Sequence, residues 1–382
     1  MKITRIETFS VPPRWVFCRV ETDAGIVGWG EPVVEGRSET VRAAVGELSD
    51  LLIGEDPRQI ERHWQRMTKG SFYRGGPILS SAVSGLDQAL WDILGKSLGV
   101  PVHVLLGGPV RDRVRMYGWI GGDDPSLVAE SAQAQKDAGL TAVKMNATGR
   151  WDRIAAAPDI REVVARAEAV REAVGEDFGI ALDFHGRVGP ADAKRLLQAL
   201  EPVSPLFVEE VVIPELGSRL PGLTASTSIP IATGERLYER VSFQPVLEAG
   251  VAVVQPDLSH AGGISESRRI AALAEMHGAL LAPHCPLGPI ALASCLQVDF
   301  ATPNFLIQEQ SIGIHYNDGA AQPLDYVIDP VPLQFPEGHI ERWHAPGLGV
   351  EVDEEAVRAA DAEGHRWRNP IWEHPDGSFA EW

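Results

Sequence analysis

The sequence has few cysteines and no long apolar run. Three cysteines occur in 382 residues, Cys18, Cys285 and Cys295, which are too few and too scattered for a disulfide framework or a zinc cluster. Cys285 follows His284, but neighbours on an extended strand point in opposite directions, so we interpret all three as reduced structural thiols. No apolar stretch approaches the roughly 18 residues that cross a bilayer. The first residues also lack a signal-peptide layout, so we expect a cytoplasmic protein without a membrane partner.

Basic residues are also scarce relative to acidic ones. Lys and Arg number 34 against 53 Asp and Glu, which gives a formal net charge of −19. An excess of this sign argues against nucleic acid or an anionic membrane surface as a partner. It also repels anionic small molecules at long range, so a bound acid must meet a local positive charge.

The length suggests about two domains. Residues 1–112 combine short β-strand patterns with helical ones, which predicts an α+β domain. From 113 to 318, short apolar runs alternate with amphipathic helical stretches. Residues 319–382 are rich in Trp and Pro, and we expect this segment to pack back on the N-terminal domain.

The middle segment contains eight short apolar runs. From the third run onward, a polar residue near the end of each run recurs at intervals of 22 to 27 residues, about one strand–loop–helix–loop unit. This regularity predicts a (β/α) barrel, whose active site lies at the carboxyl ends of its strands. The alternative is that these groups are merely solvated or cap the following helices. The polar residues are Asp183, Glu209, Glu235, Asp257, His284 and Glu309.

The first three of these residues are carboxylates from successive strands, which a barrel places side by side. Three crowded carboxylates stay ionised only beside a cation, and oxygen ligands with room for water favour Mg²⁺. Residue parity does not decide whether Glu209 or Glu210 is the middle ligand. The alternative is a set of surface carboxylates paired with Arg187 or Arg236.

Two histidines complete a set of groups for acid–base chemistry. His185 lies two residues after Asp183, so on a continuing strand both would face the mouth of the barrel. His284 lies on a later strand, where Asp257 could orient it and raise its basicity. Glu309 could hydrogen-bond a developing oxyanion if its surroundings keep it protonated. Enolase-type active sites use a Lys or His base together with Mg²⁺. These groups predict loss of an α-proton and a β-hydroxyl, which turns a 2,3-dihydroxy acid into a 2-keto-3-deoxy acid.

The chain resembles the enolase superfamily, mandelate racemase subgroup, over nearly its whole length. The matching blocks include "ETDAGIVGWGEPV", "FYRGGPIL", "DQALWDI", "LDFHGR", "QPDLSHAGGI", "APHCPLGPIALA" and "QEQSIGIHYN". The resemblance implies a (β/α)₇β barrel, a form of TIM barrel, under a capping domain that the C-terminal tail completes. It also implies one Mg²⁺ in each active site and a homo-oligomer.

The resemblance also implies a role for each candidate residue. It favours the first Glu of "VEE" as the middle metal ligand, between Asp183 and Glu235. His185 and His284 would be the acid–base pair, Asp257 would modulate His284, and Glu309 would stabilise the transition state. The capping-loop residues that the resemblance places near the sugar-acid pocket are Arg14, Asp23, Tyr73 and Arg74. Lys144 and Asn146 are two further candidates for contact with the substrate.

Two positions depart from the subgroup. Many relatives carry Lys-x-Lys on the second barrel strand, but here Asn146 replaces the second Lys. The missing ammonium base argues against simple two-base racemisation and leaves dehydration favoured. Val211 stands where a Pro commonly follows the paired Glu, and the change removes no catalytic group.

The resemblance implies a sugar acid as substrate, and more narrowly D-galactonate. The alternatives are a dehydratase or an epimerase for another aldonate or uronate. A third hypothesis is a protein that binds sugar acids without turnover. Binding alone would not require the two acid–base histidines.

Overall fold

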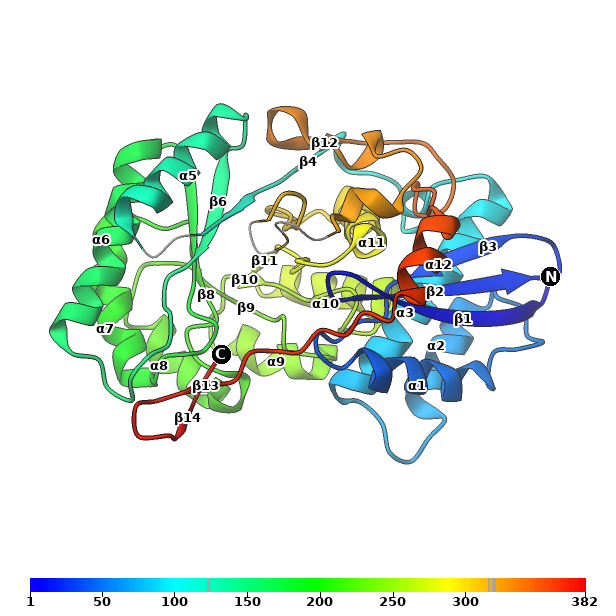
Figure 1. Cartoon of the computed structure of the whole chain (residues 1–382), viewed down its shortest axis with the longest axis horizontal. Helices are drawn as coiled ribbons and strands as arrows, with labels where there is room; N and C mark the ends of the chain where they lie inside the picture. The colour runs from blue at the N-terminus through cyan, green and yellow to red at the C-terminus, as the bar shows by residue number, and fades with distance from the viewer. Residues whose placement is uncertain (122–123, 315–316, 318–320) are drawn as a thin grey trace.

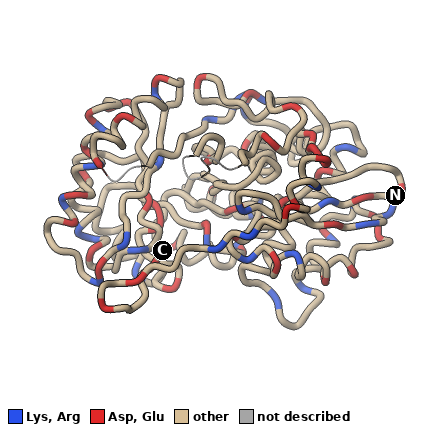
Figure 2. Tube along the Cα trace, viewed as in Figure 1, with Lys and Arg blue, Asp and Glu red and all other residues tan. Residues whose placement is uncertain are grey.

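Figure 1 shows two bodies that lie side by side. The computed structural model describes residues 1–121, 124–314, 317 and 321–382. A smaller domain with an antiparallel sheet contains the N-terminus, and a barrel of parallel strands surrounded by helices forms the larger one. Figure 2 shows both signs of charge spread over both domains, so the net negative charge is not confined to either. Among the helices that the structure describes, none has the length and apolar character needed to cross a membrane.

The smaller domain is built on the antiparallel sheet β1-β2-β3. Its strands and helices are β1 (Ile3–Val11), β2 (Trp15–Thr22), β3 (Val27–Gly30), α1 (Ser38–Ser49), α2 (Ile60–Lys69), α3 (Gly76–Leu98) and the short α4 (Val102–Leu105). Helix α3 packs directly on β3, because glycines at the contact carry no side chain. A Cβ at Gly30 would lie 1.8 Å from the carbonyl oxygen of Gly85.

The barrel strands alternate with helices along the chain. In the described residues the parallel sheet has the order β11-β10-β9-β8-β7-β6-β5. The strands are β5 (Gly118–Ile120), β6 (Ala142–Asn146), β7 (Gly179–Asp183), β8 (Phe207–Glu209), β9 (Ile231–Thr233), β10 (Val253–Val254) and β11 (Leu280–Leu281). The helices are α5 (Pro125–Asp137), α6 (Ala157–Val174), α7 (Pro190–Leu200), α8 (Leu220–Thr224), α9 (Arg240–Glu248), α10 (Gly263–Met276) and α11 (Pro289–Ala301).

The last apolar run of the sequence closes the barrel. Phe305 forms a parallel bridge with Leu281 of β11, and Gln308 forms one with Met116 just before β5. This run therefore takes the place of an eighth strand, and the expected (β/α)₇β barrel with a capping domain is confirmed. The start of the barrel segment, which was expected at residue 113, differs from expectation. Arg113–Arg115 form β4, which pairs antiparallel with β12 (His339–Glu341) outside the barrel sheet. The barrel strand β5 begins only at Gly118.

The C-terminal segment packs on the smaller domain before it returns to the barrel. Helix α12 (Glu354–Ala362) lies against β1, where Asp361 accepts a 2.7 Å hydrogen bond from the Ser10 N–H. Glu354 forms a 3.0 Å ion pair with Arg19 of β2. Beyond α12 the chain runs back to the barrel and ends in the hairpin of β13 (Trp372–Glu373) and β14 (Phe379–Ala380) (Figure 1).

Two buried acids of the smaller domain bind the first turns of barrel helices. Asp87 of α3 accepts hydrogen bonds from the backbone N–H (2.9 Å) and the hydroxyl (2.6 Å) of Ser265 in α10. Glu31 accepts them from the N–H groups of Gly288 (2.7 Å) and Ala291 (2.9 Å) at the start of α11. First-turn N–H groups have no partner within a helix, and these carboxyl oxygens supply one. These contacts hold the smaller domain over the barrel mouth.

Candidate active site

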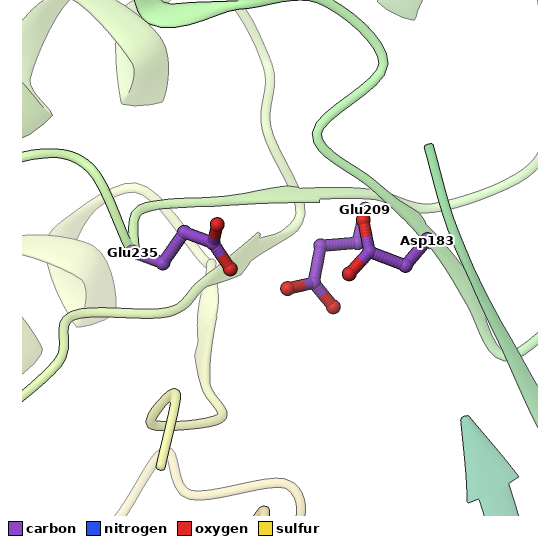
Figure 3. Close-up of side chains that lie close together, drawn as sticks. All are labelled: Asp183, Glu209 and Glu235. Atoms are coloured by element: carbon purple, nitrogen blue, oxygen red, sulfur yellow. The ribbon is translucent and has the colours of Figure 1, made fainter. Parts of the chain in front are cut away.

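Three carboxylates converge at the carboxyl ends of neighbouring barrel strands. Asp183 ends β7, Glu209 ends β8 and faces Asp183 in register, and Glu235 follows β9 by two residues. One oxygen atom from each lies within 4.8 Å of the others. Figure 3 shows the three carboxylates turned toward a common point. The structure therefore brings together the three residues that the sequence analysis named as metal ligands.

The carboxylate cluster fits a hard divalent cation. The buried atoms Oδ2 of Asp183 and Oε2 of Glu235 accept no hydrogen bond from the part of the chain that the structure describes. Burial raises the pKa of Glu209 well above its usual value, and the charge of Asp183 raises it further. A cation would bind these oxygens and relieve the repulsion between them.

The adjacent acid, Glu210, faces another partner. Its Oε1 lies 3.0 Å from the Arg236 Nε, and its Oε2 accepts from Nη2 of the same guanidinium. Glu210 has a φ of +42°, which turns its side chain away from the cluster that Glu209 joins. Val211, the departure from the subgroup pattern, is fully buried in the hydrophobic core.

His284 follows β11 and lies between two carboxylates. Its Nδ1 is 2.8 Å from Oδ2 of the buried Asp257, and its Nε2 is 3.2 Å from Oε2 of Glu235. Burial opposes the charge on this imidazole, yet Glu235, Glu309 and Asp257 together raise the pKa of His284 well above its usual value. The hydrogen bond to Asp257 fixes the ring so that Nε2 is the atom presented to the cavity.

His185 reaches the same cavity by a different route from the one expected. Strand β7 ends at Asp183, and His185 has a φ of +49°, so the chain has already turned and strand alternation no longer applies. The ring stacks on Trp119 with centroids 6.3 Å apart, and its Nε2 lies 3.1 Å from Oδ2 of Asp183. Burial lowers the pKa of His185 to about 3, so the ring is neutral here.

Lys144 lies behind the carboxylates instead of at the cavity surface. Its side chain is fully buried, with Nζ 2.8 Å from Glu209 and 2.9 Å from Glu309. Lys144 is not among the residues that line the cavity. The expected direct contact with substrate is therefore not supported. Its charge is already engaged, and the two carboxylates account for its position.

Glu309 could donate a hydrogen bond to an oxyanion only if it were protonated, and its surroundings do not favour that form. Burial raises its pKa, but Lys144 and His284 outweigh this effect and lower the pKa of Glu309 to about 2. Its oxygens also accept hydrogen bonds from the Trp119 Nε1–H and from the Cys285 N–H at 2.9 Å. The group is thus a carboxylate that accepts hydrogen bonds, and it holds Lys144 and Trp119 in place.

A cavity of about 870 Å³ opens above the cluster. His185, Glu235 and His284 line it, and so does Asn146 at the end of β6. Several arginines line the same cavity and give it the local positive charge that an anionic ligand of this acidic protein requires. These are Arg14, Arg150, Arg166, Arg187 and Arg236.

Three candidate substrate contacts from the capping loops lie elsewhere. Asp23 occupies the turn between β2 and β3, where it accepts a 2.7 Å hydrogen bond from the Lys2 N–H. Tyr73 is 82% exposed and packs edge-on against Phe72, and Arg74 is also exposed. None of the three lines the described cavity, whereas Arg14 does. Spacing alone did not tell which end of each capping loop faces the barrel.

Sequence reasoning missed several residues of the cavity wall. Arg187 and Arg236 directly follow the strand ends "LDFHG" and "IATGE", a signal that we read only as possible pairing of surface charge. The residues that the sequence gave no reason to place in the wall include Trp119, Arg166, Tyr238, His260, Trp367, Trp372 and Trp382.

Comparisons with known proteins agree with this geometry. Residues 6–107 match the mandelate racemase / muconate lactonizing enzyme N-terminal domain, and residues 127–356 match the enolase C-terminal domain-like family. The D-galactonate dehydratases of Variovorax paradoxus and Pectobacterium atrosepticum are 54% and 53% identical over the full length of both chains.

Solved structures show the same fold. An enolase from Agrobacterium radiobacter with bound Na and L-malate has a TM-score of 0.91 and 33% identity, with all of both chains covered. A member of the enolase superfamily from Salmonella Typhimurium has a TM-score of 0.86 and 29% identity over 94% of this chain and 97% of that one.

Proposed function

The chain belongs to the mandelate racemase / muconate lactonizing enzyme family of the enolase superfamily, and we propose that it is a D-galactonate dehydratase. It is a hydro-lyase that converts D-galactonate to 2-dehydro-3-deoxy-D-galactonate and water. The full-length similarity to enzymes of that name supports the substrate. The observation that supports the reaction is the placement of two histidines, His185 and His284, in one cavity beside a carboxylate cluster.

His284 is the base in this proposal. Asp257 holds its Nδ1, so Nε2 is the atom that takes the proton from C2 of the substrate. The C2–H bond breaks, and its electron pair moves toward the substrate carboxylate. Glu235 is the first of the charges that raise the pKa of His284. Base function therefore requires that Glu235 be engaged by another partner.

His185 is the acid that completes the reaction. It protonates the 3-hydroxyl as the C3–O bond breaks, and water leaves. The resulting enol takes up a proton at C3 and loses the proton of its C2 hydroxyl, which gives the 2-keto-3-deoxy acid. Because burial lowers the pKa of His185 in the ligand-free site, the anionic substrate would have to raise that pKa on binding for His185 to act as the acid.

We propose that the cation is Mg²⁺, one per site, held by Asp183, Glu209 and Glu235. When bound, it would supply positive charge for the substrate carboxylate as negative charge develops there. Behind the cluster, Lys144 and Glu309 would keep the ligands in place. The donor set supports a hard cation, and loss of activity with a chelator, restored best by Mg²⁺ among divalent cations, tests the assignment.

Three further proposals concern the location, the oligomeric state and the domain division of the enzyme. The three free, buried cysteines fit a reducing compartment, so we propose that the enzyme is cytoplasmic. We also propose that it forms a homo-oligomer, as members of this subgroup commonly do. Size-exclusion chromatography with light scattering tests the oligomer, and a monomer would contradict it. We also propose that the chain divides into an α+β capping domain (1–112), a catalytic barrel (113–318) and a C-terminal segment that packs on the capping domain (319–382).

A panel of aldonic and aldaric acids tests the function. With Mg²⁺ present, semicarbazide detects the 2-keto-3-deoxy product, and we expect D-galactonate to be preferred. In heavy water, a dehydratase yields a keto acid, whereas an epimerase yields a deuterated diastereomer without loss of water. Preference for another acid would keep the reaction and refute the substrate. Binding without turnover of any acid would favour the sugar-acid-binding alternative.

Replacing His185 separates the two histidine roles. If His284 alone removes the proton, His185→Asn abolishes water loss but preserves exchange of the C2 proton with solvent. Exchange is followed by proton NMR in heavy water. Loss of exchange along with dehydration would contradict this division of roles.

A further inference from the structure

The last 18 residues form a strap between the two domains. On the smaller domain, His365 Nε2 lies 2.6 Å from the Pro13 carbonyl oxygen, and Arg368 donates a 2.9 Å hydrogen bond to the Gly36 carbonyl oxygen. On the barrel, the strap is held through the loop between β6 and α6. Arg150 donates to the Glu373 carbonyl oxygen at 3.0 Å. In Figure 1 this red segment crosses from α12 to the barrel.

Three tryptophans of the strap form part of the cavity wall. Trp367, Trp372 and Trp382 all line the cavity that contains the two histidines. The ring of Trp382 lies 6.3 Å from Trp367 and 6.4 Å from Trp372, centroid to centroid. The indoles thus contact one another as a cluster. The spacing of the three tryptophans along this irregular segment does not predict such a cluster. Large rigid aromatic surfaces of this kind are typical of ligand pockets.

Two of these indoles also contact arginines of the cavity. The Arg187 guanidinium lies over Trp372 at 4.8 Å, and that of Arg14 lies over Trp367 at 5.8 Å. Arg187 comes from the barrel, two residues after His185, whereas Arg14 comes from the smaller domain. Stacking on an indole restricts a guanidinium. Arg14 is also held by a 3.0 Å ion pair with Glu35, and Arg187 donates a hydrogen bond to the Thr148 carbonyl oxygen. The strap therefore positions one cation from each domain at the same cavity.

We propose that Trp367 and Trp372 are specificity-determining residues of the sugar-acid site. They form its outer wall and position Arg14 and Arg187 against the distal hydroxyls of the substrate. The inference rests on the proposed function, because the reacting carbons must lie beside His185 and the carboxylate cluster. The remaining carbons of a six-carbon acid then extend toward the strap. A shorter acid would react at the same groups without reaching it.

The test compares two substrates in strap variants. Trp372→Ala removes both the wall and the stacking, whereas Trp372→Phe keeps much of the wall and guards against a variant that fails to fold. Phe379→Ala is the matched control, because Phe379 lies in the same hairpin, is 74% exposed and does not line the cavity. The substrates are D-galactonate and a four-carbon acid with the same C2 and C3 configuration.

For D-galactonate, we expect Trp372→Ala to raise KM about tenfold, within the range of desolvated cation–π contacts, with kcat changed little. Trp372→Phe lies between this variant and the parent, and Phe379→Ala matches the parent. For the four-carbon acid, kcat/KM, or Ki where it does not react, stays unchanged. Equal losses for both acids, or no loss for either, would overturn the proposal.

Limited trypsin digestion separates this inference from the proposed function. The strap carries exposed cleavage sites at Arg366 and Arg368. With Mg²⁺ and D-galactonate, we expect slower cleavage there in the parent and no such protection in Trp372→Ala. If the parent binds and protects but does not turn over D-galactonate, the proposed function fails while the strap inference stands. Absence of protection in the parent would overturn the inference.

Discussion

Replacing Lys144 with Met tests whether one buried cation holds the carboxylates at the strand ends. Met is of similar length, flexible and uncharged. The Lys144 Nζ lies within 3.0 Å of both Glu209 oxygens and 2.9 Å from Glu309. Burial lowers the pKa of this lysine, but the two glutamates raise it well above its usual value. The substitution therefore removes a full positive charge from a site without solvent access.

The size of the effect follows from the burial of the partners. Removing one partner of a buried ion pair costs about 3–5 kcal/mol. With an unfolding entropy of about 2.1 cal/mol/K per residue, a chain of 382 residues loses about 1 °C of Tm for each ~0.8 kcal/mol. We therefore expect Lys144→Met to lower Tm by about 4–6 °C at pH 7.

The assay is thermal unfolding with and without Mg²⁺, with Lys194→Met as the control. Lys194 is exposed on α7, so its replacement changes Tm by about 1 °C or less. Mg²⁺ should narrow the deficit of Lys144→Met, because it restores positive charge to the carboxylates.

The pH dependence has a defined sign. Without Lys144 the buried carboxylates have folded pKa values above their unfolded ones, so the folded state binds more protons. Stability from such groups is full below the unfolded pKa and is lost as pH rises. The Tm deficit of Lys144→Met should therefore widen from pH 6 to pH 8. Equal Tm values for both variants, or a deficit that shrinks with pH, would refute the reasoning.

Three other substitutions test separate parts of the structure. Trp119→Phe keeps an aromatic ring beside His185 but removes the N–H that donates to Glu309. We expect kcat to fall about tenfold, which corresponds to the low end of the free energy of a hydrogen bond to a charged group. An unchanged kcat would contradict this expectation. Burial raises the pKa of Asp87 from 3.8 to about 7, so its contribution to stability is full below pH 3.8 and is lost as pH rises through 7. The Tm of Asp87→Asn relative to the parent should therefore increase between pH 5 and 8, and a constant difference would count against it. Gly30→Ala places a Cβ 1.8 Å from a backbone oxygen of α3, so unfolding by urea should begin at lower concentration than in the parent, while an unchanged midpoint would show that β3 can move.

The barrel and the convergence of its three carboxylates could be predicted because both depend on local periodicity. Each strand–helix unit repeats at nearly constant length, and the barrel brings each strand end to the same mouth. Asp183, Glu209 and Glu235 could therefore be placed together before any contact was known. The same argument brought in His284, which lies between Glu235 and Asp257 in the structure.

The wall of the cavity could not be predicted, because it depends on contacts between segments that lie far apart in the sequence. Trp372 reaches Arg187 across 185 positions of the chain, and no periodic pattern encodes that contact. Lys144 fits its strand pattern equally well at the surface or in the core, and only the two glutamates around it decide its burial. Tyr73 follows a motif of the subgroup, yet it lies exposed on its loop.

The paired acids "EE" show how backbone conformation resolved an ambiguity that sequence left open. On an extended strand, alternation would send Glu209 and Glu210 to opposite faces without saying which face holds the carboxylate cluster. The left-handed conformation of Glu210 costs about 1–2 kcal/mol for a residue other than Gly, so its ion pair with Arg236 must offset that cost. Arg236 also donates to the His185 carbonyl oxygen at 3.2 Å.

The Glu210–Arg236 pair therefore connects the three loops that adjoin the carboxylate cluster. Glu210 follows β8, Arg236 follows β9, and the carbonyl that Arg236 binds belongs to the loop after β7. The N–H of Gly186 in that loop also donates to the Glu210 carbonyl oxygen at 2.8 Å. Each of these loops adjoins one carboxylate of the cluster. The second acid of the pair thus fixes the relative positions of the three carboxylates of the cluster and of the histidine beside them.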